Sequence, residues 1–326
     1  MKALVYEGVE RLVIRDTPEP KAEPGTHLVK IEAVGICGSD MHAYLGHDER
    51  RPAPLILGHE AAGVISGGPK DGTRVTINPL VSNPESLASR AGRENLCPNR
   101  QIISMPPREG AFAQFVAMPE ENLVALPDGF SSGKAALAEP LAVSWHAVRL
   151  GLEALHPAME RRALVIGGGA IGLAAALALQ ANGIKAVDVI EPNAERRTFL
   201  ETKCHQRALA TPEGTYPLVI DAVGFAATRA LACETVEPGG VIAHVGLGDS
   251  ADGLDIRRIT LQEITFIGTY TYTAQDFRDT CAAMFEGRLG ALDWTETRPL
   301  DAGQSAFADL RAGRVASPKI ILDPWG

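Results

Sequence analysis

The sequence lacks a long apolar run, a cluster of basic residues and a dense set of cysteines. No stretch approaches the ~20 apolar residues of a membrane-spanning helix, and the N-terminus lacks the apolar core of a signal peptide. The net charge is −9 without a basic patch, which excludes the electrostatic footprint of a nucleic-acid-binding protein. The five cysteines are odd in number and scattered, so a disulfide framework is not expected. These absences predict a cytoplasmic enzyme that acts on a small neutral molecule, with no nucleic acid and no membrane as partner.

Metal-ligand side chains gather instead between residues 35 and 60. They are Cys37, Asp40, His42, His59 and Glu60, with the hydroxyl of Ser39 among them. Thiolate, imidazole and carboxylate are the groups that zinc accepts, and a catalytic zinc site keeps one coordination position open. A cysteine or a histidine taken alone is usually structural. The conjunction predicts a catalytic zinc centre, with Asp40 orienting a zinc-bound His59 through its other ring nitrogen.

Length and pattern predict two domains in the 326 residues. Up to about residue 126, short alternating apolar runs broken by glycine and proline are typical of a mostly β, barrel-like domain. Further on, an apolar strand at 163–166, a G-x-G-x-x-G turn at 167–172 and an apolar helix follow one another directly. The predicted fold class is α/β, with a catalytic domain over 1–137, to which 274–326 returns, and a Rossmann-type doubly wound parallel sheet over 138–273. The active site is expected in the cleft between them.

The glycine turn predicts a dinucleotide site. The first two glycines let backbone amides approach a pyrophosphate, and the third lets helix and strand pack closely. Glu191 ends the next predicted strand, where its carboxylate accepts hydrogen bonds from the ribose of NAD and repels the 2′-phosphate of NADP. Arg196 either covers the adenine or, as a weaker alternative, meets a phosphate. The expected cofactor-binding residues are Gly167, Gly169, Ala170, Ile171, Gly172, Glu191, Arg196, Val223, Val245, Leu247 and Thr269.

Cys37-Gly-Ser-Asp, Gly-His-Glu at 58–60 and the dinucleotide turn together resemble the zinc-dependent medium-chain alcohol and polyol dehydrogenases. The resemblance spans essentially the whole chain and implies a GroES-like catalytic domain. It implies that Glu139 of the Glu-Pro-Leu motif faces the zinc. It also implies that Ser39 takes the proton of the alcohol and His42 hands it to solvent. The structural alternatives are a charge–dipole contact at a helix start for Glu139, a helix cap for Ser39 and an exposed helix position for His42.

Two departures from the resembled family carry information. Its members often hold a structural zinc on four cysteines spaced C-x2-C-x2-C-x7-C, and counting back from Cys97 finds only Ser89, Ser86 and Asn83. We therefore expect one zinc per chain and a metal-free lobe around a buried Cys97. Sorbitol-type members carry Phe-Arg-Tyr where this chain has Tyr-Thr-Tyr at 270–272, which puts sorbitol itself in doubt.

The predicted activity is zinc-dependent hydride transfer between NAD and a polyol, sugar alcohol or other secondary alcohol. The resemblance also suggests a homodimer or homotetramer. A threonine-type amino-alcohol dehydrogenase and an NADPH carbonyl reductase are alternatives within the same fold, and a non-catalytic nucleotide-binding protein is an alternative of another class. Three bound anions would reduce the acidity of zinc, so we expect either Glu60 or Glu139 to bind loosely. The remaining histidines, including His47, His146 and His244, are interpreted as structural.

Overall fold

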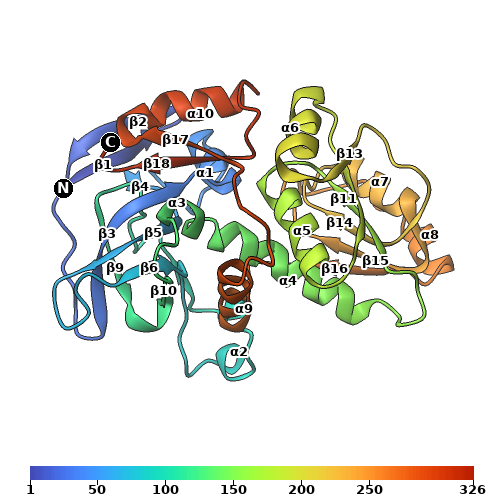
Figure 1. Ribbon diagram of the computed structural model, residues 1–326, viewed down its shortest axis with the longest axis horizontal. Helices are drawn as coiled ribbons and strands as arrows, with labels where there is room; N and C mark the ends of the chain where they lie inside the picture. The colour runs from blue at the N-terminus through green and yellow to red at the C-terminus, as the bar shows by residue number, and fades with distance from the viewer. The chain divides into compact units, whose positions relative to one another are not determined.

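The computed structural model describes all residues 1–326, which form two compact units (Figure 1). The first unit comprises Met1–Glu139, Thr273–Phe285 and Thr295–Gly326, and the second comprises Pro140–Tyr272 and Glu286–Trp294. Residues 286–294 thus pack with the second unit, whereas the sequence assigned them to the returning segment. The physical reason is that Leu289, Leu292 and Trp294 bury their side chains and Arg288 lies over the ring of Trp145.

The first unit is built on mostly antiparallel sheets, in which only β17 and β18 pair in parallel. A seven-stranded sheet has the order β10-β6-β5-β3-β18-β17, with β9 also pairing with β3, and β2-β1-β4 and β7-β8 form smaller sheets. The strands are β1 (Lys2–Gly8), β2 (Arg11–Asp16), β3 (Thr26–Gly35), β4 (Leu55–Ile56), β5 (Glu60–Ser66), β6 (Arg74–Ile77), β7 (Leu80–Val81), β8 (Gln101–Ile102), β9 (Phe115–Pro119), β10 (Leu123–Ala125), β17 (Thr295–Pro299) and β18 (Lys319–Asp323). The helices are α1 (Gly38–Tyr44), α2 (Leu87–Arg90), α3 (Ser132–Ala135), α9 (Ala274–Phe285) and α10 (Gly303–Arg311), with 3-10 turns at Glu94–Leu96, Glu120–Asn122 and Leu300–Ala302.

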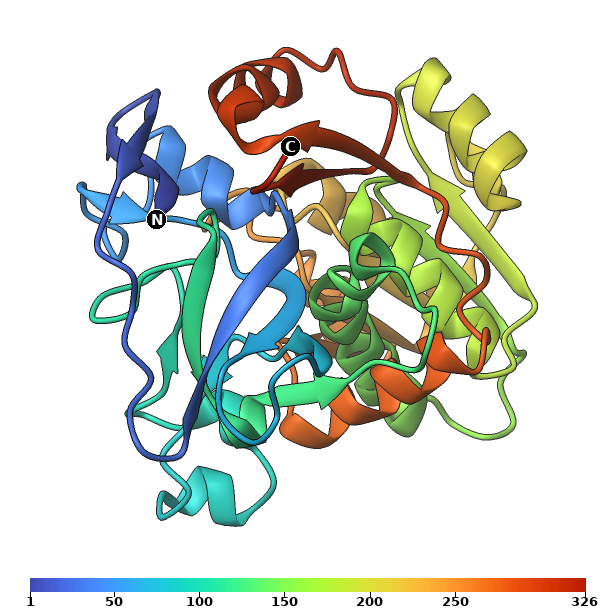
Figure 2. The ribbon, with the colours of Figure 1, turned by 60° about the vertical axis from the view of Figure 1, so that its left-hand side comes forward.

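The C-terminal strand closes the first unit against its N-terminal part. β18 runs antiparallel to β3, with Ile321 opposite Gly35 and Leu322 opposite Val34. Figure 2 shows this C-terminal segment returning to the N-terminal strands of the same unit. On its other edge β3 pairs with β5, where Gly35 lies opposite Glu60. The ends of three strands therefore meet where the predicted metal ligands begin.

The second unit is a six-stranded parallel sheet of order β13-β12-β11-β14-β15-β16. Its strands are β11 (Arg162–Ile166), β12 (Ala186–Ile190), β13 (Arg207–Leu209), β14 (Tyr216–Asp221), β15 (Val236–His244) and β16 (Thr265–Gly268). Its helices are α4 (Ala138–Ala154), which begins just before the unit does, α5 (Ala170–Ala181), α6 (Ala194–Cys204), α7 (Ala226–Thr235) and α8 (Ile256–Leu261). The strand order reverses between β11 and β14, which is the switch point where such sheets bind ligands. The predicted fold class is confirmed.

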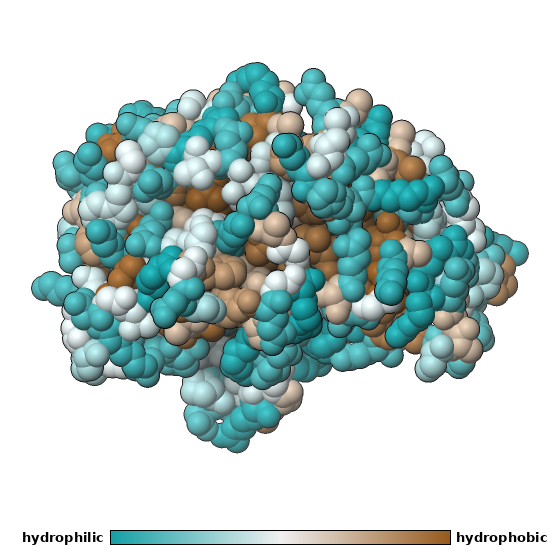
Figure 3. Space-filling view, viewed as in Figure 1, coloured by the Kyte–Doolittle hydropathy of each residue, from teal (hydrophilic) through white to brown (hydrophobic).

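The face of the molecule seen in the view of Figure 1 is mostly polar. The face shown in Figure 3 carries mainly hydrophilic side chains, with hydrophobic ones visible between them. None of the helices has both the length and the apolar character needed to cross a membrane.

Candidate functional site

Three predicted ligands meet at the strand ends of the first unit. Cys37 lies just after β3, His59 directly precedes β5 and Glu60 is its first residue, and one donor atom of each lies within 4.8 Å of the others. A left-handed Gly58 makes the turn before them possible, and a side chain there would overlap Phe112. A thiol, an imidazole and a carboxylate at this spacing fit zinc, and no other group of three such residues in the chain converges in this way.

Asp40 joins the two loops that carry these ligands. It is fully buried, and its carboxylate accepts hydrogen bonds from the amides of Cys37 at 3.0 Å and Gly58 at 3.1 Å. Its Oδ1 also lies 3.4 Å from His59 Nδ1, which is where the predicted orienting role would place it. Burial alone would raise the pKa of Asp40, but His59 and Arg51 lower it.

His59 is held on both sides of its ring. Ser104 Oγ lies 3.2 Å from Nδ1 and Ser39 Oγ lies 3.4 Å from Nε2. Burial would lower the pKa of His59, but the negative charges of Asp40 and Cys37 raise it well above the ordinary value. A bound metal requires the neutral imidazole, so metal binding at this site releases a proton. Metal affinity is therefore expected to rise with pH.

The structure also corrects one interpretation of Ser39. The residue that precedes α1 is Cys37, and Asp40 accepts the hydrogen bond from the Cys37 amide. Ser39 is the second residue of the helix and does not cap it. Its hydroxyl faces His59 Nε2 instead, beside the donor atoms, because α1 turns that side of the helix toward β5. His42 lies one turn further along α1 and is half-buried, and its part in proton transfer stays a prediction.

Lys319 is a site residue that the sequence motifs did not reveal. It is the first residue of β18 and is buried, and its Nζ donates to Glu60 Oε1 at 2.6 Å and Oε2 at 2.7 Å. Burial would lower the pKa of Lys319, but the negative charges of Glu60 and Cys37 raise it. The one sequence signal was a lysine in an otherwise apolar strand, Lys-Ile-Ile-Leu. A charge at such a position requires a buried partner.

Ser104, which contacts His59, and Arg51, which contacts Ser104, belong to no sequence motif. Ser104 is buried and left-handed, with φ of 71°, a conformation rare outside glycine that marks local strain. Arg51 is buried, and its Nε donates to the Ser104 carbonyl at 3.0 Å while Nη2 lies 3.4 Å from Ser39 Oγ. Asp48 compensates the guanidinium charge at 2.5 Å. Ser104, Arg51 and Asp48 thus form a connected set of polar contacts beside the His59 ring.

Glu139 lies outside the group of three. It is the second residue of α4 and is buried, and its negative charge contributes to the raised pKa of Lys319. A carboxylate in the first turn also has a favourable contact with the helix dipole. Glu139 is thus within electrostatic reach of the site, and its role as a ligand stays a prediction.

The lobe around Cys97 has the expected residues in place. Cys97 is buried and its Sγ lies 4.0 Å from the Asn83 carbonyl, while Ser86 Oγ donates to Ser89 Oγ at 2.9 Å. Hydrogen bonding from Ser86 is the main cause that lowers the pKa of the Cys97 thiol. Hydroxyl oxygens are poor zinc ligands, so a metal-free lobe remains our expectation.

The dinucleotide turn follows β11 as predicted from the sequence pattern. Gly167 is left-handed, a side chain at Gly172 would overlap the Gly167 carbonyl, and Gly169 immediately precedes α5. Glu191 directly follows β12, and its carboxylate accepts hydrogen bonds from the amides of Gly168 at 3.1 Å and Asn193 at 2.8 Å. Arg196 Nη1 lies 3.5 Å from Glu191 Oε2. Glu191 is therefore anchored at the mouth of the turn. Ala170 and Ile171 are the first two residues of α5, and their contacts with a cofactor stay a prediction.

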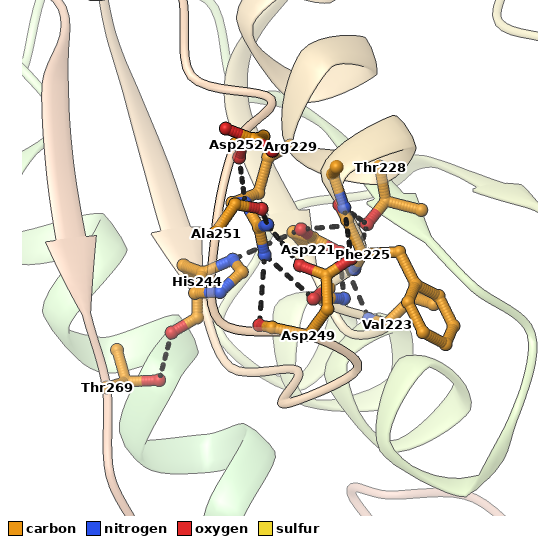
Figure 4. Close-up of polar contacts among 12 residues, drawn as sticks. Asp221, Val223, Phe225, Thr228, Arg229, His244, Asp249, Ala251, Asp252 and Thr269 are labelled. Carbon is orange, nitrogen blue, oxygen red and sulfur yellow. Dashed lines mark hydrogen bonds and ion pairs between the residues drawn. The ribbon is translucent and has the colours of Figure 1, made fainter.

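Asp221 organises the carboxyl ends of β14 and β15 (Figure 4). Its carboxylate accepts hydrogen bonds from the Val223 and Gly224 amides, both at 3.0 Å, and its carbonyl accepts one from the Val245 amide at 3.0 Å. His244 Nδ1 lies 3.1 Å from Asp221 Oδ2, so this histidine does have a polar constellation, contrary to the expectation from sequence. Burial would raise the pKa of Asp221, but His244 and the two amides lower it.

Two other residues predicted to bind the cofactor, Thr269 and Leu247, lie near Asp221 and His244 at the carboxyl ends of the strands. Thr269 donates from its amide and its hydroxyl to the His244 carbonyl, at 2.9 and 3.1 Å. Leu247 is 70% exposed just beyond β15, a position available to a ligand. The turns that contain Val223 and Val245 are thus both bonded to Asp221, the first through its carboxylate and the second through its backbone carbonyl.

A group of side chains that can bind zinc and a Rossmann-type sheet with a dinucleotide-binding turn, present on one chain, are typical of the zinc-dependent alcohol dehydrogenases. Two family models match the chain, the alcohol dehydrogenase GroES-like domain over residues 23–128 and the zinc-binding dehydrogenase over residues 170–286. The chain is 31% identical to sorbitol dehydrogenase 1 of Saccharomyces cerevisiae over 338 residues, covering 94% of this chain and 91% of that protein.

Solved structures agree with this match. The acetophenone reductase of Geotrichum candidum in complex with NAD is 25% identical with a TM-score of 0.87, covering 99% of this chain and 96% of that one. A putative zinc-binding dehydrogenase of Sinorhizobium meliloti bound to NADP is 25% identical with a TM-score of 0.86, covering 99% of both chains. The chain belongs to the zinc-dependent medium-chain dehydrogenases and is similar to sorbitol dehydrogenase. The predicted family is confirmed, and the chain is an oxidoreductase that acts on CH–OH groups.

Proposed function

We propose that this protein oxidises a secondary hydroxyl of a polyol or sugar alcohol with NAD, and reduces the corresponding carbonyl in reverse. The observation that carries the proposal is the convergence of Cys37, His59 and Glu60 in a chain that also holds the dinucleotide turn. Cys37 and His59 would hold zinc, with Glu60 or Glu139 as a further ligand. Zinc supplies Lewis acidity that lowers the pKa of an alcohol.

Ser39 and His42 are the proposed route for the proton. The Ser39 hydroxyl lies 3.4 Å from His59 Nε2, beside the metal-donor atoms, and so can accept a proton from a hydroxyl bound there. Arg51 Nη2 lies 3.4 Å from the same oxygen, and its positive charge favours release of the proton onward. His42, on the same short helix, is partly exposed and can pass the proton to solvent.

Glu191 supports NAD as the cofactor. The carboxylate already accepts two amide hydrogen bonds and is buried, so a phosphate placed beside it would meet a fixed negative charge. Arg196 lies close enough to Glu191 to be partly neutralised, which weakens the alternative that it binds a phosphate. An NADPH carbonyl reductase is therefore the less favoured candidate.

Thr271 supports a small hydroxylated substrate. It is left-handed, with φ of 46°, and its buried Oγ1 has no hydrogen-bond partner in the protein. An unpaired buried hydroxyl costs about 1–3 kcal/mol, and strain in a β-branched residue adds to this cost. Both are typical of positions completed by a ligand. A hydroxyl takes one substrate hydroxyl, whereas a forked cation would take two, so we propose a vicinal diol or short polyol.

We further propose a homodimer or homotetramer joined through the second unit. β16 is the edge strand of its sheet and pairs only with β15, so one row of backbone groups is open. Ile256 and Leu261 of the preceding helix are 62% and 68% exposed. An open strand with apolar neighbours favours pairing with a second copy, which light scattering can test. All five cysteines are free, which supports a reducing, cytoplasmic location.

The decisive experiment measures zinc per chain together with NAD reduction over a panel of diols, polyols and amino alcohols. One zinc per chain with activity on diols or polyols is the expected result. Preference for amino alcohols would favour a threonine-type dehydrogenase, and turnover only with NADPH and carbonyls would favour a reductase. Dinucleotide binding without zinc or turnover, in protein never exposed to chelator, would favour a non-catalytic binding protein.

A further inference from the structure

Asp221 and His244 join the ends of two neighbouring strands of the parallel sheet through their side chains (Figure 4). They lie opposite each other at the carboxyl ends of β14 and β15, and His244 Nδ1 is 3.1 Å from Asp221 Oδ2. The Asp221 side chain is 0% exposed. Burial would raise the pKa of Asp221, but His244 and two backbone amides lower it, so the carboxylate is ionised and only accepts hydrogen bonds. Nδ1 of His244 therefore carries the proton of this bond.

His244 is the one partner of this carboxylate that comes from another strand. The remaining donors all follow Asp221 along the chain. They are the amides of Val223 and Gly224, both at 3.0 Å, and the hydroxyl of Thr228 at 3.1 Å. The position of the carboxylate relative to β15 thus depends on the imidazole of His244.

His244 also contacts the strand on its other side. Gly268 lies opposite it in the β15–β16 ladder, and the His244 carbonyl accepts hydrogen bonds from the amide and the hydroxyl of Thr269 at 2.9 and 3.1 Å. The ring of Phe266, in β16, has its centroid 5.5 Å from that of the His244 ring. One histidine therefore connects the carboxyl ends of β14, β15 and β16.

The turns that follow β14 and β15 are in direct backbone contact. The Gly248 amide donates to the Val223 carbonyl at 3.1 Å, and a side chain on Gly224 would overlap the Gly246 carbonyl. A shift of the first turn therefore shifts the second, which contains Leu247 with its 70% exposed side chain. The bond between Asp221 and His244 lies at the base of both turns.

The order of the strands assigns the two halves of a dinucleotide to different turns. Ligands of such sheets lie outside the carboxyl ends of the strands, where the strand order reverses. The glycine turn and Glu191, proposed for the adenosine side, follow β11 and β12, which leaves β14, β15 and β16 for the nicotinamide half. We infer that His244 is a positioning residue for the nicotinamide half, which acts by fixing Asp221 and with it the two turns, an inference that rests on the proposed dinucleotide site.

NADH and ADP-ribose test the inference, because ADP-ribose lacks the nicotinamide half. His244→Leu removes the donor and keeps an apolar side chain beside Phe266. We expect its affinity for NADH to fall by about tenfold, the scale of one lost hydrogen bond to a charged group, and its affinity for ADP-ribose to stay within about twofold. Titration calorimetry of the full-length protein measures both affinities without turnover. His156→Leu, at an exposed histidine of the same unit, is the matched control and should change neither affinity.

Further variants test whether His244 acts through Asp221. His244→Asn places an amide N–H close to the position of Nδ1 and should bring the NADH affinity back to within about threefold of wild type. His244→Gln carries the same amide one bond further out and should not. Asp221→Asn should also weaken NADH binding, and His244→Leu added to it should cause little further loss, because the two residues share one interaction.

ADP-ribose binding also reports whether each variant is folded. Unchanged NADH affinity in His244→Leu that binds ADP-ribose would overturn the inference, and so would equal losses for both ligands. Losses that multiply fully in the double variant would show that His244 does not act through Asp221. If His244→Leu binds neither ligand, the Asn and Gln variants decide, and equal NADH affinities in these two would refute the role of Nδ1. A wild-type chain that binds neither ligand would contradict the dinucleotide site itself, and with it this inference.

Discussion

Asp40→Asn is the substitution whose consequences follow most directly from the geometry of the site. The buried carboxylate accepts from two backbone amides and lies 3.4 Å from His59 Nδ1. Asparagine keeps the shape but has only one acceptor oxygen, so either the Cys37 or the Gly58 amide is left facing an NH₂ group. An unsatisfied buried donor costs about 1–3 kcal/mol. Loss of the charged partner of His59 brings the total to about 3–5 kcal/mol in metal-free protein.

The loss of stability in Asp40→Asn depends on pH, and the shifted pKa values of Asp40 and His59 decide in which direction. The pKa of Asp40 is lowered, so its contribution is present above about pH 4, its unfolded value, and is lost as pH falls through the folded pKa. The pKa of His59 is raised, so its contribution is full below about pH 6.5 and is lost as pH rises through the folded pKa. The pair therefore stabilises metal-free protein most between about pH 4 and 6.5.

Urea unfolding of chelator-treated protein at several pH values measures this effect. The free energies of unfolding of wild type and Asp40→Asn should differ most near pH 5.5. As His59 loses its proton at higher pH, the difference should fall to about 1–3 kcal/mol, which is the cost of the unsatisfied amide hydrogen bond alone. Zinc affinity, measured by chelator competition, should fall by about 10–100-fold, because the orienting partner of His59 is lost. Asp128→Asn, at an exposed carboxylate of the same unit, is the matched control. Zinc affinity within threefold of that control would refute the reasoning.

Four other substitutions test the remaining roles. Glu191→Ala should raise the KM for NAD by about tenfold, the equivalent of one or two lost hydrogen bonds, and lower that for NADP; equal changes for both cofactors would contradict the assignment. Ser39→Ala should lower kcat by about 100-fold or more, and His42→Asn should flatten the pH profile of kcat with a smaller loss; an unchanged profile would exclude this proton route. Thr271→Val should raise the polyol KM by about fivefold with kcat nearly unchanged, whereas a more stable protein with the same KM would show that the hydroxyl has no ligand.

Much of the architecture follows from local patterns that the sequence states directly. The strand, glycine turn and apolar helix at 163–181 predict a βα unit because each step has its own physical requirement. The convergence of Cys37 with His59 and Glu60 was predictable because the ligand types and the resemblance agree. The packing of residues 286–294 with the second unit was not predictable. Apolar residues such as Leu289 and Leu292 show that a segment is buried, but they do not show which part of the chain covers it.

The residues that hold the predicted site residues in place could not be predicted from the sequence. Lys319 lies far from Glu60 along the chain and meets it only because β18 pairs with β3. Ser104 contacts His59 from a loop without a motif, and Arg51 in turn binds the Ser104 carbonyl, through contacts that depend on a left-handed backbone and a long side chain. His244 acquires its partner Asp221 because neighbouring parallel strands end at one edge. Such pairs are properties of register, which a single sequence does not display.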